Sequence, residues 1–153
     1  MPWLCAVLAA LAAPLVLLAL LGARSRGVRP VALGPHAGRL APCPASPNCV
    51  SSQAAGDGHF VKPLRFEGVA GEAWRRLREV LLALPRVRIV AATPLYLRAE
   101  FRSPLFGLVD DVEFLLDETA GRIEIRSASR VGYSDLGANR RRVEEIRRRL
   151  AAS

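Results

Sequence analysis

An apolar run at the N-terminus constrains this chain more than any other feature. From Pro2 to Gly22 the only ionisable side chain is that of Cys5. A helix of about 20 apolar residues is long enough to cross the hydrocarbon core of a bilayer, and a helix in a soluble core rarely lacks a polar face over such a length. The run contains Pro14, which membrane helices tolerate. We expect residues 1–23 to form a transmembrane anchor.

A cleavable signal peptide is the alternative interpretation of this segment. No Lys or Arg precedes the apolar run, however, and the run is longer than the roughly 7–15 residues of a typical signal-peptide core. Cleavage after Ala23 would place Leu21 and Ala23 at the recognised positions, which is a mediocre match. We therefore favour an anchor that stays attached.

Residues 24–42 are rich in Gly, Pro and Arg and have no periodicity, which predicts a linker near the membrane surface. Arg24, Arg26 and Arg29 follow the apolar run, and the positive-inside rule would keep that side in the cytoplasm. The cysteines that come next favour the opposite side of the membrane. We expect an extracytoplasmic domain, with the cytoplasmic face as the alternative.

Cys43 and Cys49 are separated by a short segment that contains two prolines. Two cysteines this close in a loop favour a disulfide and an oxidising compartment. Free thiols are one alternative. A metal site is another, but it would need His36 and His59, and that spacing matches no established metal pattern. We expect a disulfide and no metal or cofactor.

The composition limits the remaining possibilities. The chain has 153 residues, 51% of them apolar and 24% charged, which suits one globular domain beyond the anchor and excludes a disordered chain. The formal net charge is +8, and Lys62 is the only lysine. An Arg-rich, Lys-poor composition is typical of a GC-rich genome, and only 6% of the residues are aromatic. We expect no nucleic-acid partner.

Residues 43–153 predict an α+β domain in which an antiparallel sheet of about five strands carries two helices on one face. The first strand is expected within Phe60 to Phe66. A helix with apolar residues at three- and four-residue steps follows from Ala70 to Leu84, and Pro85 ends it. Four alternating strands follow. The last helix is expected from Asp135 to Ala151, with an apolar stripe made of Leu136, Val143, Ile146 and Leu150.

The last two strands form a hairpin whose register follows from its turn. A four-residue turn over 118–121 pairs Asp117 with Arg122 and, further back, Glu113 with Arg126 on the outer face. The same register places four residues on the side facing the helices, in the pairs Asp110 with Ser129 and Val112 with Ser127.

Asn139 interrupts the apolar stripe of the last helix, so we expect its side chain in the core. It could meet the polar residues of the hairpin beneath this helix: Asp110, Ser127 and Ser129. The first interpretation of this cluster is a structural network that ties the helix to the strand ends, with Ser134 or Asp135 as the helix cap. The second is a ligand or catalytic pocket, with Asp110 as acid or base and Arg126 or Arg130 holding an anion.

Other sequence evidence for a catalytic, phosphate-binding or metal-binding site is weak. The chain has no glycine-rich phosphate loop, nucleophile elbow or paired-histidine motif. Asp110 and Asp111 point to opposite faces of a strand, so they do not predict a metal site. The last helix carries six arginines: Arg140, Arg141, Arg142, Arg147, Arg148 and Arg149. Four of them lie off the apolar stripe and mix with Glu144 and Glu145, which is typical of a solvated face: Arg141, Arg142, Arg148 and Arg149. Anionic lipid is the next interpretation of this basic helix.

Three segments resemble the domain of unknown function 1499 family of bacterial and plastid proteins: CPASPNCVSSQ (43–53), GLVDDVEF (107–114) and IRSASRVGYSDLGANRRRVEEIR (125–147). The resemblance covers essentially the whole globular part. It implies no established activity. It does imply an envelope location, because family members are often secreted, lipid-anchored or membrane-anchored, although this chain lacks a lipid-attachment cysteine after the apolar run.

From these observations we expect a membrane-anchored, non-catalytic domain of the cell envelope that binds a small ligand, a lipid or a protein partner. The alternative is a hydrolase-like enzyme that uses the cluster around Asp110.

Overall fold

The computed structural model describes residues 2–28 and 33–152. Arg29, which entered the orientation argument, lies outside the described residues. The helices and strands are, in chain order, α1 (Pro2–Gly27), β1 (Cys49–Ser51), β2 (Leu64–Arg65), α2 (Ala70–Ala83), β3 (Val87–Ala92), β4 (Tyr96–Arg102), β5 (Val109–Asp117), β6 (Arg122–Ser129) and α3 (Ala138–Ala151).

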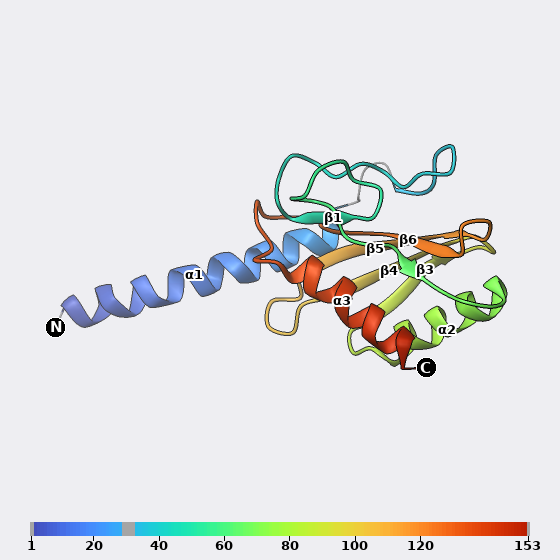
Figure 1. The fold of residues 1–153 in the computed structure, drawn as a ribbon. Helices are drawn as coiled ribbons and strands as arrows, with labels where there is room; N and C mark the ends of the chain where they lie inside the picture. Colours follow the sequence, from blue (N-terminus) through green and yellow to red (C-terminus); the bar gives the residue numbers. More distant parts are fainter. Residues whose placement is uncertain (1, 29–32, 153) are drawn as a thin grey trace.

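The expected α+β architecture is confirmed. The strands form one antiparallel sheet in the order β1-β6-β5-β4-β3, and β2 also pairs with β6. Helices α2 and α3 lie side by side against one face of this sheet (Figure 1). The sheet has six strands because the segment around Cys49 adds β1, which the sequence analysis did not foresee. The strand expected within Phe60 to Phe66 shrinks to β2 and a single parallel bridge between Ser51 and Phe60.

The apolar core lies between the sheet and the two helices. Helix α2 buries Ala73, Trp74, Leu77, Val80 and Leu81, the face that its three- and four-residue spacing predicts. Pro85 follows, where the missing N–H and fixed φ of proline disfavour a further turn. The sheet supplies the other side of the core with Leu97, Phe101, Val112, Phe114, Ile123 and Ile125.

The hairpin register is confirmed residue by residue. Asp117 pairs with Arg122, Glu113 with Arg126, and Asp110 with Ser129. Because side chains alternate along a strand, this register decides which side chains face the helices and which face away.

Helix α3 begins later than the sequence analysis predicts. Gly137 adopts a left-handed conformation with φ 79°, and the carboxylate of Asp135 accepts the backbone N–H groups of Gly137 (3.0 Å) and Asn139 (2.7 Å). Asp135 is therefore the capping side chain, one of the two residues expected for that role. Leu136 precedes the helix and is 84% exposed, so its expected place in the apolar stripe is wrong.

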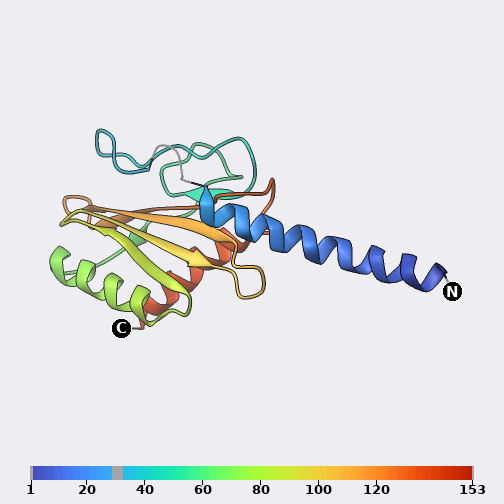
Figure 2. The same cartoon turned by 180° about the vertical axis from the view of Figure 1, so that it is seen from behind.

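Helix α1 projects from one end of the domain (Figures 1 and 2). The stretch Ala10–Gly27 is long and apolar enough to cross a membrane and is 11% buried. The helix continues past Ala23 to Gly27, and its last turns are packed on the domain. Ser25 is fully buried, and its hydroxyl accepts the N–H of Val109 at 3.1 Å and donates to the carbonyl of Gly22 at 2.9 Å.

Residues 33–42 lie on the face of the sheet that the helices leave uncovered. Leu40 is buried there against Tyr96 and Leu115. The backbone N–H of Gly34 donates to Glu113 Oε1 at 2.8 Å. The sheet is thus enclosed by helices on its inner face and partly by this segment on its outer face.

Candidate functional site

The polar residues predicted to converge beneath α3 do so. Asn139 is fully buried, as its place in the helix predicted. Its Oδ1 accepts the hydroxyl of Ser127, and its Nδ2 donates to Ser129 Oγ at 3.0 Å and to the carbonyl of Asn48 at 3.0 Å. The cluster therefore joins α3 to β6 and to the residue before β1.

Arg142 completes this cluster, although the sequence analysis placed it on a solvated face. Its guanidinium forms an ion pair with Asp110 and donates to Asn139 Oδ1 (2.6 Å) and Ser127 Oγ (3.0 Å). It also lies over the ring of Phe101, 4.8 Å from the centroid. The signal that could have found it is its position three residues after Asn139, which places both side chains on one face of a helix.

The geometry of this inner cluster is that of a closed network. The side chains of Asp110 and Arg142 are 13% and 15% exposed, and each polar group of the cluster bonds to another. A general acid or base must have a substrate within hydrogen-bond reach. Here the carboxylate of Asp110 is occupied by the Arg142 guanidinium instead.

Arg126 and Arg130 lie on the opposite face of the sheet from Asp110. Arg126 pairs with Glu113 at 3.0 Å, and Arg130 pairs with Asp111 at 2.7 Å and Glu100 at 2.6 Å. Neither arginine therefore shares a site with Asp110, because Arg126 alternates along β6 with the inward-facing Ser127 and both guanidinium groups bond to carboxylates of the outer face.

The contacts of this outer network shift the pKa values of three of its members. The hydrogen bond to Asp111 raises the pKa of Arg130 above its usual value despite burial. Burial would raise the pKa of Glu100, but the hydrogen bond and charge of Arg130 bring it below the usual range. Burial and the charge of Glu113 raise the pKa of Tyr96, whose O–H donates to Glu113 Oε1 at 2.8 Å.

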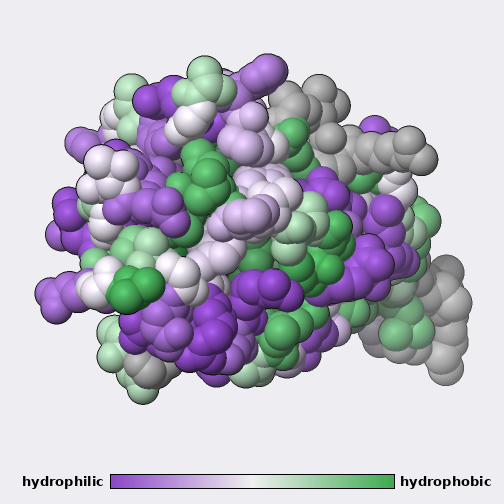
Figure 3. All heavy atoms as spheres, turned by 90° about the vertical axis from the view of Figure 1, so that its right-hand side faces the viewer, coloured by the Kyte–Doolittle hydropathy of each residue, from purple (hydrophilic) through white to green (hydrophobic). Residues whose placement is uncertain are grey.

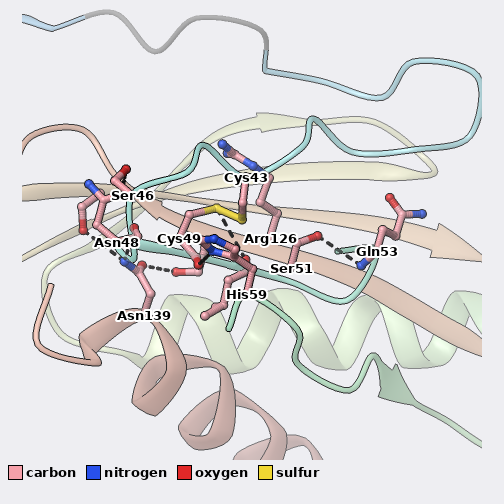
Figure 4. The surroundings of a disulfide bond; sticks show 12 residues. Cys43, Ser46, Asn48, Cys49, Ser51, Gln53, His59, Arg126 and Asn139 are labelled. Carbon is pink, nitrogen blue, oxygen red and sulfur yellow. Dashed lines mark hydrogen bonds between the residues drawn. A yellow bond between two sulfur atoms is a disulfide. The ribbon is translucent and has the colours of Figure 1, made fainter. Parts of the chain in front are cut away.

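The predicted disulfide is present. It joins Cys43 to Cys49, whose Cα atoms are 5.6 Å apart. His59 lies beside it (Figure 4), with Nδ1 2.9 Å from the carbonyl of Cys49. No group of three or more His, Cys, Asp or Glu side chains within residues 2–28 and 33–152 could hold a metal ion. His36 and His59 instead line a pocket of about 770 Å³ between the segment 33–43 and the loop 51–59.

A second pocket, of about 700 Å³, is lined by β2, the first turns of α2, the start of β6 and the end of α3, and α2 and β6 both start at the end of the domain away from α1 (Figure 1). We call it the distal pocket. Its apolar lining includes Leu64, Phe66, Ala73, Ile123 and Leu150. Its charged lining consists of the cations Lys62, Arg65, Arg76 and Arg147 and one anion, Glu67. Figure 3 looks onto this end of the molecule and shows several apolar patches between hydrophilic side chains.

Neither the distal pocket nor the histidine-lined pocket includes Asp110, Ser127, Ser129, Asn139 or Arg142. The residues that sequence reasoning selected as a candidate site are thus not the residues that line these two pockets. The distal pocket was missed because its lining comes from β2, α2, β6 and α3, and only packing of these elements brings it together.

The comparisons with known proteins add one finding. No curated protein and no solved structure matches the chain. The model of one family, described as a protein of unknown function (DUF1499), matches residues 39–150. This match includes β1 to β6, the disulfide, all of α2, and α3 as far as Leu150. The chain therefore belongs to the DUF1499 family, as the three sequence segments indicated.

Proposed function

We propose that this chain is a membrane-anchored, non-catalytic domain of the cell envelope that binds a small amphiphilic anion in the distal pocket. The ligand class is an acidic group attached to a short apolar body. The single observation that carries this proposal is the lining of the pocket, which combines apolar walls with four cationic side chains and one carboxylate.

Each part of the lining has a counterpart in such a ligand. Apolar side chains at the base of a pocket favour an apolar body, and a few charged groups at its edge orient the ligand and select its charge. Lys62 and Arg65 are exposed at the rim. Arg147 is positioned at the rim by its bonds to Glu144 and to the carbonyl of Lys62. The local charge therefore favours an anion.

The hydrolase alternative has less support. It would use Asp110, which is paired with Arg142 and surrounded by the bonded side chains of Ser127 and Asn139. The packing of this cluster suits a structural role, in which α3 is held against β5 and β6.

Titration of the full-length protein in dodecyl maltoside micelles with hexyl phosphate tests the proposal, with empty micelles as the blank. We expect saturable binding of hexyl phosphate and weaker binding of both hexanol and inorganic phosphate, since the pocket offers contacts to each half of the ligand. The double variant Lys62→Glu/Arg65→Glu should raise the Kd at least about tenfold.

The matched control is Arg78→Glu/Arg148→Glu, which changes the net charge equally at exposed residues outside the pocket. This control should change the Kd less than about twofold. Equal losses in both double variants, or no saturable binding by the unmodified protein, would contradict the proposal.

The proposed side of the membrane is extracytoplasmic. The Cys43–Cys49 disulfide supports it, because disulfides persist in oxidising compartments, and Arg24 and Arg26 at the end of α1 oppose it. A C-terminal alkaline phosphatase fusion should be active and a fluorescent-protein fusion dark. The reverse pattern would place the domain in the cytoplasm, where the cysteines would be free thiols.

A further inference from the structure

The end of the domain from which α1 emerges carries exposed apolar side chains on two loops. The loop 103–108 joins β4 to β5, and the segment 130–137 joins β6 to α3. Both lie next to α1 where it leaves the domain, on either side of it (Figures 1 and 2). Leu105 is 80% exposed, Tyr133 76% and Leu136 84%. Single exposed apolar residues are ordinary, but a group at one end of a molecule indicates a contact surface.

The exposure of Leu136 is not a by-product of packing. Its backbone is left-handed, with φ 52°, a conformation that is disfavoured for a leucine because its Cβ crowds the following carbonyl. The side chain contributes little to the core, and Asp135 rather than Leu136 caps α3. The domain therefore holds a large apolar side chain in solvent at a conformational cost.

No flexible spacer separates α1 from these loops. A Cβ on Gly22 would come within 1.9 Å of the carbonyl oxygen of Phe106, so only glycine permits this close approach of the helix to the loop 103–108. The next turn is held by buried Ser25, which bonds to Val109. Arg130 Nη1 donates to the carbonyl of Ser25 at 3.5 Å. The end of the helix is thus fixed on the domain.

This docking sets the depth of the loops relative to a bilayer. The hydrocarbon core takes about 20 helical residues, and the apolar run of α1 ends at Gly22. Residues 22–25 are therefore at the boundary between hydrocarbon and headgroups when α1 spans the membrane. The loops that contact these residues must lie at the same level.

The chemistry around the loops suits this layer. Tyrosine is enriched at membrane interfaces, where its ring is buried and its hydroxyl hydrated. Arg24 and Arg26 are exposed in the last turn of α1. Arg141 is exposed next to the second loop and donates to the carbonyl of Leu136 at 2.8 Å. Cations at this depth attract anionic headgroups.

We propose that Leu105, Tyr133 and Leu136 enter the interfacial layer of the bilayer that α1 spans, so that the domain is held against an anionic lipid surface in one orientation. This inference rests on the anchoring of α1 in a membrane. In that orientation the distal pocket faces away from the lipid.

Spin labelling of the full-length protein in vesicles of phosphatidylcholine and phosphatidylglycerol tests the proposal. In a Cys5→Ser background with the disulfide intact, nitroxides are attached to Leu105→Cys, Leu136→Cys, Leu11→Cys in α1, or Val69→Cys. Val69 is 74% exposed just before α2, and α2 starts at the end of the domain far from α1 (Figure 1). Oxygen partitions into lipid, whereas a water-soluble nickel complex stays outside it. We expect the ratio of nitroxide collisions with oxygen to collisions with the nickel complex to be several-fold higher for the labels at 105 and 136 than for the label at 69.

The controls separate this inference from the anchor itself. The labels at 105 and 136 could give the same collision ratio as the label at 69 while the label at 11 is exposed to lipid. In that case the proposed interfacial contact is wrong, but the anchoring of α1 in the membrane is confirmed. If the label at 11 also collides mainly with the nickel complex, the anchoring of α1 is wrong. Immobile labels at 105 and 136 without an oxygen preference would show that a second copy or another protein covers the loops, which overturns the proposal.

Discussion

On the face of the sheet covered by α2 and α3, buried side chains are apolar except near the start of α3, whereas on the opposite face many of them are charged. Glu113 is fully buried, Asp111 2% exposed and Arg126 7% exposed on that outer face. Its cover is the segment 33–42 rather than a helix. The inner face is thus stabilised mainly by apolar burial, and the outer face by carboxylates and guanidinium groups that must stay paired.

Losing one partner of a contact therefore lowers the free energy of unfolding by different amounts on the two faces. An apolar contact that is lost leaves a cavity. An ion pair that is broken on a buried face leaves a charge that water cannot reach, which costs more than the pair contributes when it is intact. The three predictions that follow use this asymmetry.

Arg130→Met breaks the outer network at its centre. It leaves the buried carboxylates of Asp111 and Glu100 without their shared guanidinium, so we expect a loss of about 3–5 kcal/mol in the free energy of unfolding. Urea denaturation followed by Trp74 fluorescence in a Trp3→Phe background measures it. The matched control is Arg88→Met, because Arg88 bonds to the same Glu100 but its side chain is 67% exposed.

The control variant should lose less than about 1 kcal/mol. If Arg88→Met cost as much as Arg130→Met, the outer face would have to be accessible to water, and the contrast between the two faces would fail.

Asn139→Leu tests the polar end of the inner face. The leucine has a comparable size but leaves the hydroxyls of Ser127 and Ser129 and the guanidinium of Arg142 without their amide partner. We expect a loss of about 1–3 kcal/mol, measured by the same denaturation. Arg148→Leu on the exposed side of α3 should change stability by less than about 0.5 kcal/mol. A near-zero effect at Asn139 would mean that this network adds nothing to the apolar core.

The smallest effect concerns the cap of α3. Burial would raise the pKa of Asp135, but the N–H groups of Asn139 and Gly137 bring it below its usual value. A carboxyl with a lowered pKa in the folded state stabilises the protein above its unfolded pKa of about 3.9, and this contribution disappears as the pH falls through the folded pKa. The stability advantage of the unmodified protein over Asp135→Asn should be about 1 kcal/mol at pH 7.

Denaturation curves between about pH 7 and pH 2.5 show whether this advantage shrinks. Asp135→Ala serves as the comparison, because it removes the acceptor at every pH. An advantage over Asp135→Asn that stayed constant with pH would rule out a charged cap as its cause.

Which side chains point toward the inner face was largely predictable, because it follows from the two-residue period of strands and the 3.6-residue period of helices. The turn after Asp117 sets the pairing of β5 with β6, and from that pairing alone Asp110 and Ser129 must face the helices. The spacing of Val143 and Ile146 likewise places Asn139 on the buried side of α3. These inferences need only the geometry of a strand, a turn or a helix.

The strand β1 and the role of Arg142 were not predictable in the same way. Cys49–Ser51 is buried at all of its positions, so it shows no alternation that could mark it as a strand. Arg142 has a long side chain that extends from α3 to Asp110 in the sheet. Helical periodicity predicts the direction in which a side chain leaves the helix, but not which residue its end contacts. Leu136 is apolar and so suggested a place in the helical stripe, but α3 begins only after Gly137.

The amino-acid sequence is enough to predict the apolar length of α1, the α+β class of the domain, the hairpin register and the inward position of Asn139. Each of these follows from the periods of helices and strands and from the hydrophobic effect. Three other features are visible only in the folded domain: the segment 33–42 covers the charged face, Ser25 fixes α1 on the domain, and Lys62, Arg65 and Arg147 meet at the distal pocket. These features join residues far apart in the chain, and no local period connects them, so they exist only once the sheet and helices have packed.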